Sequence, residues 1–105
     1  MNVIIKPCKE SIGTGFRWEV RDKKDRLIGI FDAVDKTTTR YDKLVEIAKI
    51  TNLMDDLFDV KQRIKDLIHK DNAWEVNDAA SQARTQTENA IEELNLMRDH
   101  LDSEI

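Results

Sequence analysis

The sequence predicts an α+β protein, in which a small antiparallel β-meander of about three strands precedes one helix and a long antiparallel helical hairpin. Apolar and polar residues alternate in the first third, as in a strand, and apolar residues recur at steps of three and four further on, as in a helix. The 105 residues fit one domain. We divide this domain, residues 1–105, into a meander over 1–34, a first helix over 38–50, and hairpin helices over 52–69 and 72–104.

Three short strands are expected before residue 35. Val3 to Ile5 and Leu27 to Phe31 are apolar runs. Between them, three apolar residues alternate with charged ones, which is typical of a strand with one buried face: Phe16, Trp18 and Val20. A sheet this small needs a helix packed on its apolar face.

The first helix is expected over 38–50, with Thr39 able to cap it. Its apolar face points about half a turn away from the stripe that begins at Ile50. We therefore predict a break in the chain there, with Asn52 capping the next helix. The alternative is one continuous helix from Thr39 to His69, which would need a partner on each side.

Two apolar stripes predict the helical hairpin. The first consists of Ile50, Leu53, Leu57, Val60, Ile64 and Leu67. The second consists of Val76, Ala80, Ala83, Thr87, Ala90, Leu94, Met97 and Leu101. Only the segment from His69 to Asn72 separates the stripes, and Asn72 with Glu75 forms a capping pattern that starts the last helix.

The last helix is expected to be longer than its hairpin partner, so its C-terminal end overruns that partner. Three bulky residues lie in this end: Leu94, Met97 and Leu101. They must be covered either by the first helix and the sheet or by a second copy of the chain. We predict a homodimer that self-associates through these three residues.

Charge is distributed unevenly along the chain. The net charge is −4, but residues 71–105 hold nine acidic and two basic residues, a net −7. Four of these acids are expected on the outer side of the last helix: Glu88, Glu92, Asp99 and Asp102. This ridge either keeps the protein soluble or binds a partner with a basic surface, and we predict the second role.

Trp74 lies in the first turn of the last helix and points away from the apolar stripe. An outward tryptophan at the tip of a hairpin is a candidate anchor for a protein partner. The alternative is that the indole ring folds back over the turn between the hairpin helices. We predict that Trp74 contacts the partner.

These features favour a non-enzymatic protein–protein interaction module, a small adaptor or inhibitor. The alternatives are a nucleic-acid-binding protein that uses the basic and aromatic N-terminal sheet, or an acidic inhibitor that mimics nucleic acid. Six acids are interleaved with the N-terminal cations, so nucleic acid is the weaker expectation. An enzyme ranks third, because His69 and His100 are far apart in the hairpin and Cys8 has no patterned base. No catalytic residue, metal or cofactor is expected.

Composition sets the expected compartment. Cys8 is the single cysteine, so the chain forms no internal disulfide, which is typical of a reducing compartment. Its apolar runs are short for a membrane span, and its start lacks the features of a signal peptide. We therefore expect a cytoplasmic protein without a membrane partner.

Overall fold

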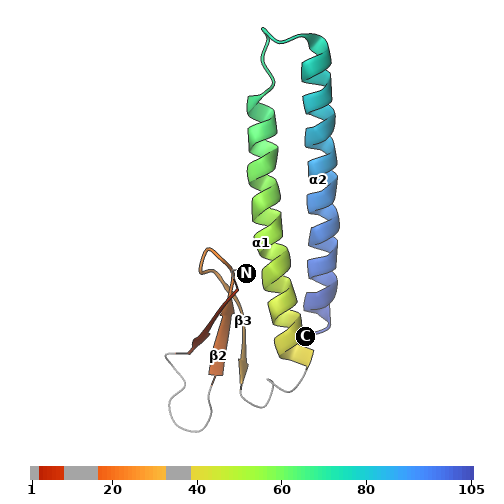
Figure 1. The fold of residues 1–105 in the computed structure, drawn as a ribbon. Coiled ribbons are helices and arrows are strands. Elements are labelled where there is room, and N and C mark those ends of the chain that lie inside the picture. Colours follow the sequence, from red (N-terminus) through yellow and green to blue (C-terminus); the bar gives the residue numbers. More distant parts are fainter. Residues whose placement is uncertain (1–2, 9–16, 33–38) are drawn as a thin grey trace. The chain divides into compact units, whose positions relative to one another are not determined.

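The computed structural model describes residues 3–8, 17–32 and 39–105 (Figure 1). The described residues form a sheet followed by helices, so the α+β class is confirmed. The elements are β1 (Ile4–Pro7), β2 (Arg17–Arg21), β3 (Leu27–Asp32), α1 (Thr39–Asp66) and α2 (Trp74–Ser103). In this part of the chain, no helix combines the length and the apolar character that crossing a membrane requires.

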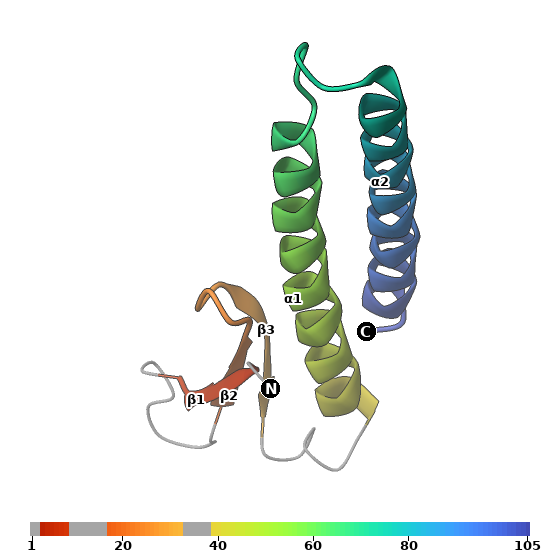
Figure 2. The same cartoon turned by 45° about the horizontal axis from the view of Figure 1, so that its top comes forward.

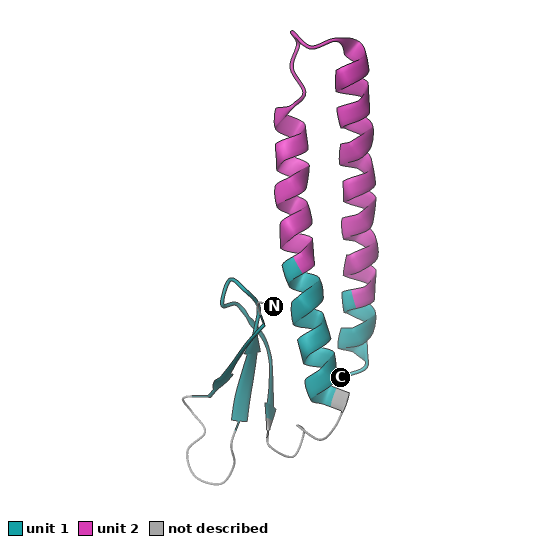
Figure 3. Ribbon diagram, in the orientation of Figure 1, with its two compact units in different colours: residues 1–52, 98–105 teal, residues 53–97 magenta. Residues whose placement is uncertain are grey.

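The chain divides into two compact units (Figure 3). The first unit contains residues 1–52 and 98–105, and the second contains residues 53–97. Both helices therefore contribute residues to both units. The single domain expected from the chain length stays a prediction.

The sheet of the first unit has the order β1-β2-β3, with antiparallel neighbours (Figure 2). Trp18 of the central strand pairs with Pro7 on one side and with Phe31 on the other. The register shifts between Val20 and Arg21, which is the position of a β-bulge or similar irregularity. Phe16, expected in this strand, lies outside the described residues, as does the side chain of Thr39.

The core of the first unit forms where the sheet packs on the N-terminal part of α1. Val20 and Phe31 from the sheet bury themselves against Leu44 and Ala48 of the helix. The helix can approach closely because β3 carries Gly29 there. A Cβ atom at Gly29 would collide with the side chain of Leu44.

The turn between β2 and β3 is built around the buried carboxylate of Asp22. Its Oδ1 accepts hydrogen bonds from the backbone N–H of Lys24 at 2.9 Å and of Arg26 at 3.0 Å. Its Oδ2 accepts one from the Arg26 guanidinium at 2.7 Å. Burial alone raises the pKa of Asp22, but these bonds outweigh it and hold the pKa below its ordinary value.

The predicted helix break at Asn52 is wrong, and the alternative of a continuous helix is correct. Asn52 lies inside α1, and its Oδ1 accepts a hydrogen bond from the backbone N–H of Lys23 at 2.8 Å. The side chain therefore completes the β2–β3 turn instead of capping a helix. The helix ends at Asp66, before the expected His69.

Helix α1 is continuous because it buries residues around a wide arc. Leu44 and Ala48 face the sheet, while Ile47, Ile50 and Met54 are also at most 7% exposed. The second group lies about a third of a turn away around the helix. The rotation of the apolar face therefore indicates more than one buried face, without any interruption of the backbone.

In the second unit, the C-terminal part of α1 (Leu53–Asp66) and most of α2 (Trp74–Met97) run antiparallel side by side (Figure 3). We call these two segments the helix pair. Lys61 Nζ of α1 lies 3.1 Å from Glu88 Oε1 of α2 and links them. Ile91 is the buried apolar residue of α2, at 8% exposure.

The seam of the helix pair differs from the two predicted stripes at most of their alternate positions. The seam positions, all partly or fully buried, are Met54, Leu57, Lys61 and Ile64 on α1, and Asn77, Ala80, Arg84, Thr87, Ile91 and Leu94 on α2. Ala83, predicted in the second stripe, is partly buried as expected. Four residues predicted in the stripes are instead exposed, by 42–53%: Leu53, Val60, Val76 and Met97. Leu67 and Ala90, also predicted there, are exposed too. Polar residues occupy several seam positions and make contacts there, which conceals the true register from an apolar pattern.

The expected overrun of the last helix is also wrong. Because α1 has no break, its 28 residues nearly match the 30 residues of α2. In the first unit, Glu104 pairs with Lys43 near the start of α1 at 3.1 Å. Leu94 and Leu101 are half-buried and Met97 is exposed. The homodimer stays a prediction, but the overrun no longer supports it.

Candidate protein-binding surface

Side-chain hydrogen bonds hold the turn that joins α1 to α2. Asn72 Nδ2 donates to the carbonyl of Leu67 at 2.8 Å. Asn77 Nδ2 donates to the carbonyl of His69 at 2.7 Å, and its Oδ1 accepts from the backbone N–H of His69 at 3.2 Å. Asn72 thus bonds the residue that directly follows α1, and α2 begins at Trp74 rather than at the predicted Asn72.

Trp74 projects from this turn with 73% of its surface exposed, the highest value among the exposed large apolar side chains described. The indole ring therefore does not fold back over the turn. Asp78 lies one helical turn further on the same side of α2 and is also exposed. Asp71 and Glu75 are exposed close by in the sequence. An apolar ring among carboxylates suits a positively charged, partly apolar partner.

Of the four predicted acidic residues, Glu88 lies elsewhere than expected. It is half-buried and pairs with Lys61 at 3.1 Å and with Arg84 at 3.8 Å, so its charge is compensated within the helix pair. The prediction that it lies on an unbalanced outer ridge is wrong. Glu92 in the second unit and Asp99 and Asp102 in the first are exposed, as expected.

Phe58 of α1 is a surface residue that the sequence analysis missed. It is 51% exposed and lines a shallow groove together with Lys61, Glu88, Ile91 and Glu92. Helical spacing places Trp74 and Asp78 on the same side of α2 as Glu92. We call this surface, made of Trp74, Asp78, Glu92 and Phe58, the Trp74 side. The available signal for Phe58 was a lone aromatic residue outside the predicted apolar stripe of that helix.

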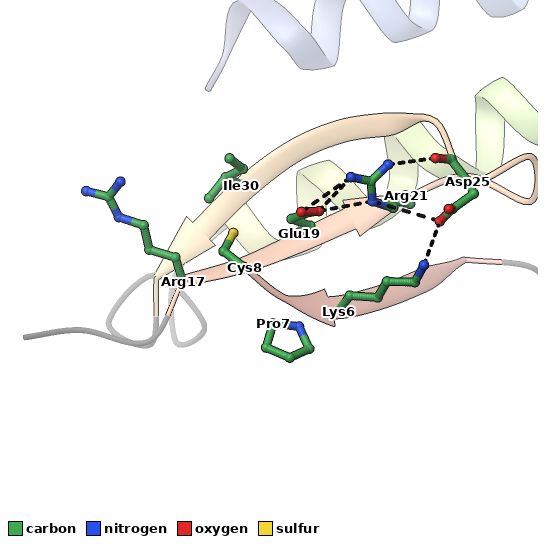
Figure 4. Close-up of a pocket in the computed structure, with 8 residues that line it drawn as sticks. All are labelled: Lys6, Pro7, Cys8, Arg17, Glu19, Arg21, Asp25 and Ile30. Carbon is green, nitrogen blue, oxygen red and sulfur yellow. Dashed lines mark hydrogen bonds and ion pairs between the residues drawn. The ribbon is translucent and has the colours of Figure 1, made fainter. Parts of the chain in front are cut away.

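Two basic residues of the sheet surface, Lys6 and Arg21, are engaged in ion pairs (Figure 4). Lys6 Nζ lies 3.0 Å from Asp25 Oδ1, and Arg21 Nη2 lies 2.7 Å from Glu19 Oε2. The hydrogen bond to Glu19 outweighs burial and raises the pKa of Arg21. A nucleic acid would have to break these pairs to bind phosphate here. The geometry therefore gives the nucleic-acid alternative little support.

The remaining chemistry and the comparisons do not add a second candidate site. Among residues 3–8, 17–32 and 39–105, no group of three or more His, Cys, Asp or Glu could hold a metal ion. Comparison of the chain with protein-family models, curated proteins and solved structures finds no match. The candidate binding site is therefore the exposed surface of the second unit.

Proposed function

We propose that this chain is a non-enzymatic protein-binding module, a small adaptor or inhibitor, whose Trp74 side binds a basic surface of a protein partner. The observation that carries the proposal is Trp74 itself, 73% exposed on a turn that Asn72 and Asn77 hold by hydrogen bonds. An exposed tryptophan adds little to folding, whereas tryptophan is enriched among the residues that dominate binding energies.

The surroundings of the ring define the chemistry of the partner. A Lys or Arg side chain can lie over the indole face, where the ring quadrupole attracts the cation. Asp78 and Glu92 then supply carboxylates for neighbouring cations on the same side of α2. Phe58 adds apolar contact area beside Glu92. The partner surface is therefore basic with apolar side chains between its charges.

The charge of the last third of the chain favours association with such a partner. Residues 71–105 carry a net −7, to which Asp99 and Asp102 contribute. A field of one sign raises the association rate of an oppositely charged protein. The proposal includes the helical hairpin as the binding element and a cytoplasmic location, which the single cysteine supports.

The first test compares two exposed apolar residues. Protein captured from the native host is identified, and its affinity is measured by calorimetry with wild type, Trp74→Ala and Leu27→Ala. Leu27 is the control, because it is 50% exposed and belongs to β3 of the first unit, outside the Trp74 side. Trp74→Ala should weaken binding by about 30-fold, or about 2 kcal/mol. Equal affinity of all three proteins would contradict the proposal.

The second test addresses charge. Asp78→Lys with Glu92→Lys should slow association of the same partner at low salt, with the difference shrinking as salt screens the exposed charges. Stopped-flow mixing at several salt concentrations measures this. An association rate that salt changes equally in wild type and variant would exclude the charged contact.

A further inference from the structure

A second exposed surface lies on the helix pair. Leu53, Val60 and Leu67 recur at intervals of seven residues along α1 and the start of the turn, and are 48%, 42% and 59% exposed. A matching row on α2 also has intervals of seven: Val76, Ala83, Ala90 and Met97. Val76 and Met97 are 51% and 53% exposed, Ala90 is exposed too, and Ala83 is half-buried. We call these two rows together the apolar side.

Both rows lie on the same side of the helix pair. One groove joins Phe58 and Lys61 of α1 to Glu88 and Glu92 of α2, which fixes one side of the seam. On each helix, an advance of about 100° per residue puts the apolar row across the seam from that groove. Because the two helices are antiparallel partners, both rows then meet on the side opposite the groove.

The apolar side exceeds what the pairing of two helices requires. A two-helix seam uses two positions of each heptad, and both are already occupied here, by Met54 and Leu57 on α1 for example. A third apolar row is typical of helices that contact two neighbours, as in a four-helix bundle. Within the second unit, each helix has one helical neighbour among the described residues. Each helix therefore offers an apolar row for one more.

We propose that the apolar side binds the apolar side of a second copy of this chain, forming a four-helix arrangement of two helix pairs. The two halves of the surface are complementary in size. The row on α1 has large residues, whereas the middle of the row on α2 has Ala83 and Ala90. A twofold axis parallel to the helices places α1 of one copy against α2 of the other, so large residues meet small ones.

Charge favours the same arrangement. Residues 53–70 contain four acidic and four basic residues, whereas residues 71–97 contain six acidic and one basic. Packing α2 against α2 would bring two strongly acidic helices together, while packing α1 against α2 avoids this repulsion.

The size of the surface is sufficient for a modest dimer. The helix pair is about 20–35 Å long and each helix about 10 Å wide, which gives on the order of 600 Å² for each copy. This value lies at the lower end of specific protein interfaces. Self-association should therefore occur at micromolar rather than nanomolar concentration.

The first experiment is sedimentation equilibrium of the full chain between about 1 and 500 μM, the range in which a modest interface associates. Wild type should shift from monomer to dimer. Val60→Lys should remain monomeric with unchanged helicity, because Val60 is 42% exposed and its replacement leaves the seam intact. Gln62→Lys, an equally charged change on an exposed residue outside the apolar side, should dimerise like wild type. If wild type stays monomeric over the whole concentration range, the proposal is wrong, and the apolar side would instead bind a different protein.

The second experiment tests the pairing by disulfide trapping in a Cys8→Ser background. A mixture of Val60→Cys and Ala90→Cys chains should form mostly mixed dimers, because Val60 of one copy faces the alanine row of the other. Predominant Val60–Val60 cross-links would overturn this arrangement. Since the Trp74 side is a separate surface, Trp74→Ala should leave self-association unchanged, so failure of either proposal is recognised separately.

Discussion

At the scale of single residues, Asp22 is the polar group on which the β2–β3 turn depends. Its carboxylate is fully buried and accepts bonds from two backbone N–H groups and from the Arg26 guanidinium. Asp22→Ala removes all these acceptors and should lower the free energy of unfolding by about 2–3 kcal/mol. Urea unfolding followed by circular dichroism measures the change.

The matched control is Asp25→Asn in the same turn. Asp25 has φ of 61°, a left-handed conformation that Asn tolerates, and its side chain is 53% exposed. Loss of its exposed ion pair with Lys6 should cost less than about 1 kcal/mol. Equal losses for the two variants would show that burial of Asp22 does not matter.

Asp22 also predicts a dependence of stability on pH. Its pKa in the folded protein lies below that in the unfolded chain, which is about 3.9. The stabilisation is therefore complete well above the unfolded value and disappears as the pH falls through the folded pKa. Wild type should lose more stability between pH 6 and pH 2 than Asp22→Asn, which has no carboxylate there. Parallel pH profiles of the two proteins would refute this assignment.

At the scale of elements, the contact between β3 and α1 depends on a missing side chain. Gly29 faces Leu44, which is 3% exposed. Gly29→Ala should destabilise the protein by about 1–3 kcal/mol, because the added methyl group displaces a packed side chain. Adding Leu44→Val, which shortens that side chain, should cost less in the Gly29→Ala protein than in wild type. Additive losses in this double-mutant cycle would show that the two positions do not interact.

The sequence predicts the elements of this fold but not the register of the helix pair. Strand alternation and helical periods located the sheet and the helical regions, because burial of one face imposes these periods directly. The seam register was not predictable from apolar residues, since Lys61, Asn77 and Arg84 occupy seam positions. Their roles depend on partners distant in sequence: Lys61 meets Glu88, and Asn77 bonds His69.

The candidate site was likewise predicted only in part. The place of Trp74 outside the apolar stripe was predicted, but the sequence left open whether its ring folds back over the turn, because that depends on the conformation of the turn. The position of Glu88 did not follow, because a shift of one residue in the register moves it from the outer surface to the edge of the seam. Phe58 was missed for the same reason.

At the scale of the whole molecule, the last eight residues belong with the start of the chain. Residues 98–105 form part of the first unit, where Leu101 is half-buried and Glu104 pairs with Lys43. Ending the chain at Met97 should cost about 1–2 kcal/mol of buried apolar surface. The melting temperature of the first unit should then fall by roughly 5–15 °C.

Trp18, half-buried beside the core of the first unit, reports this melting by fluorescence in a Trp74→Phe background. Glu104→Gln is the control and should have little effect, because the pair that it weakens is partly exposed. An unchanged Trp18 transition in the shortened chain would show that residues 98–105 do not stabilise this unit.

The hydrogen bond from Lys23 to Asn52 has a consequence for the order of folding. Asp22 satisfies most of the β2–β3 turn with neighbours in sequence, so that turn can begin to form early. The Lys23 amide, however, donates its hydrogen bond to Asn52, which lies 29 residues later in the chain. Closing that loop is slower than forming either the hairpin or a helical turn. Completion of the sheet is therefore coupled in time to the growth of α1, and a nascent chain that ends before Asn52 should hold its first strands only transiently.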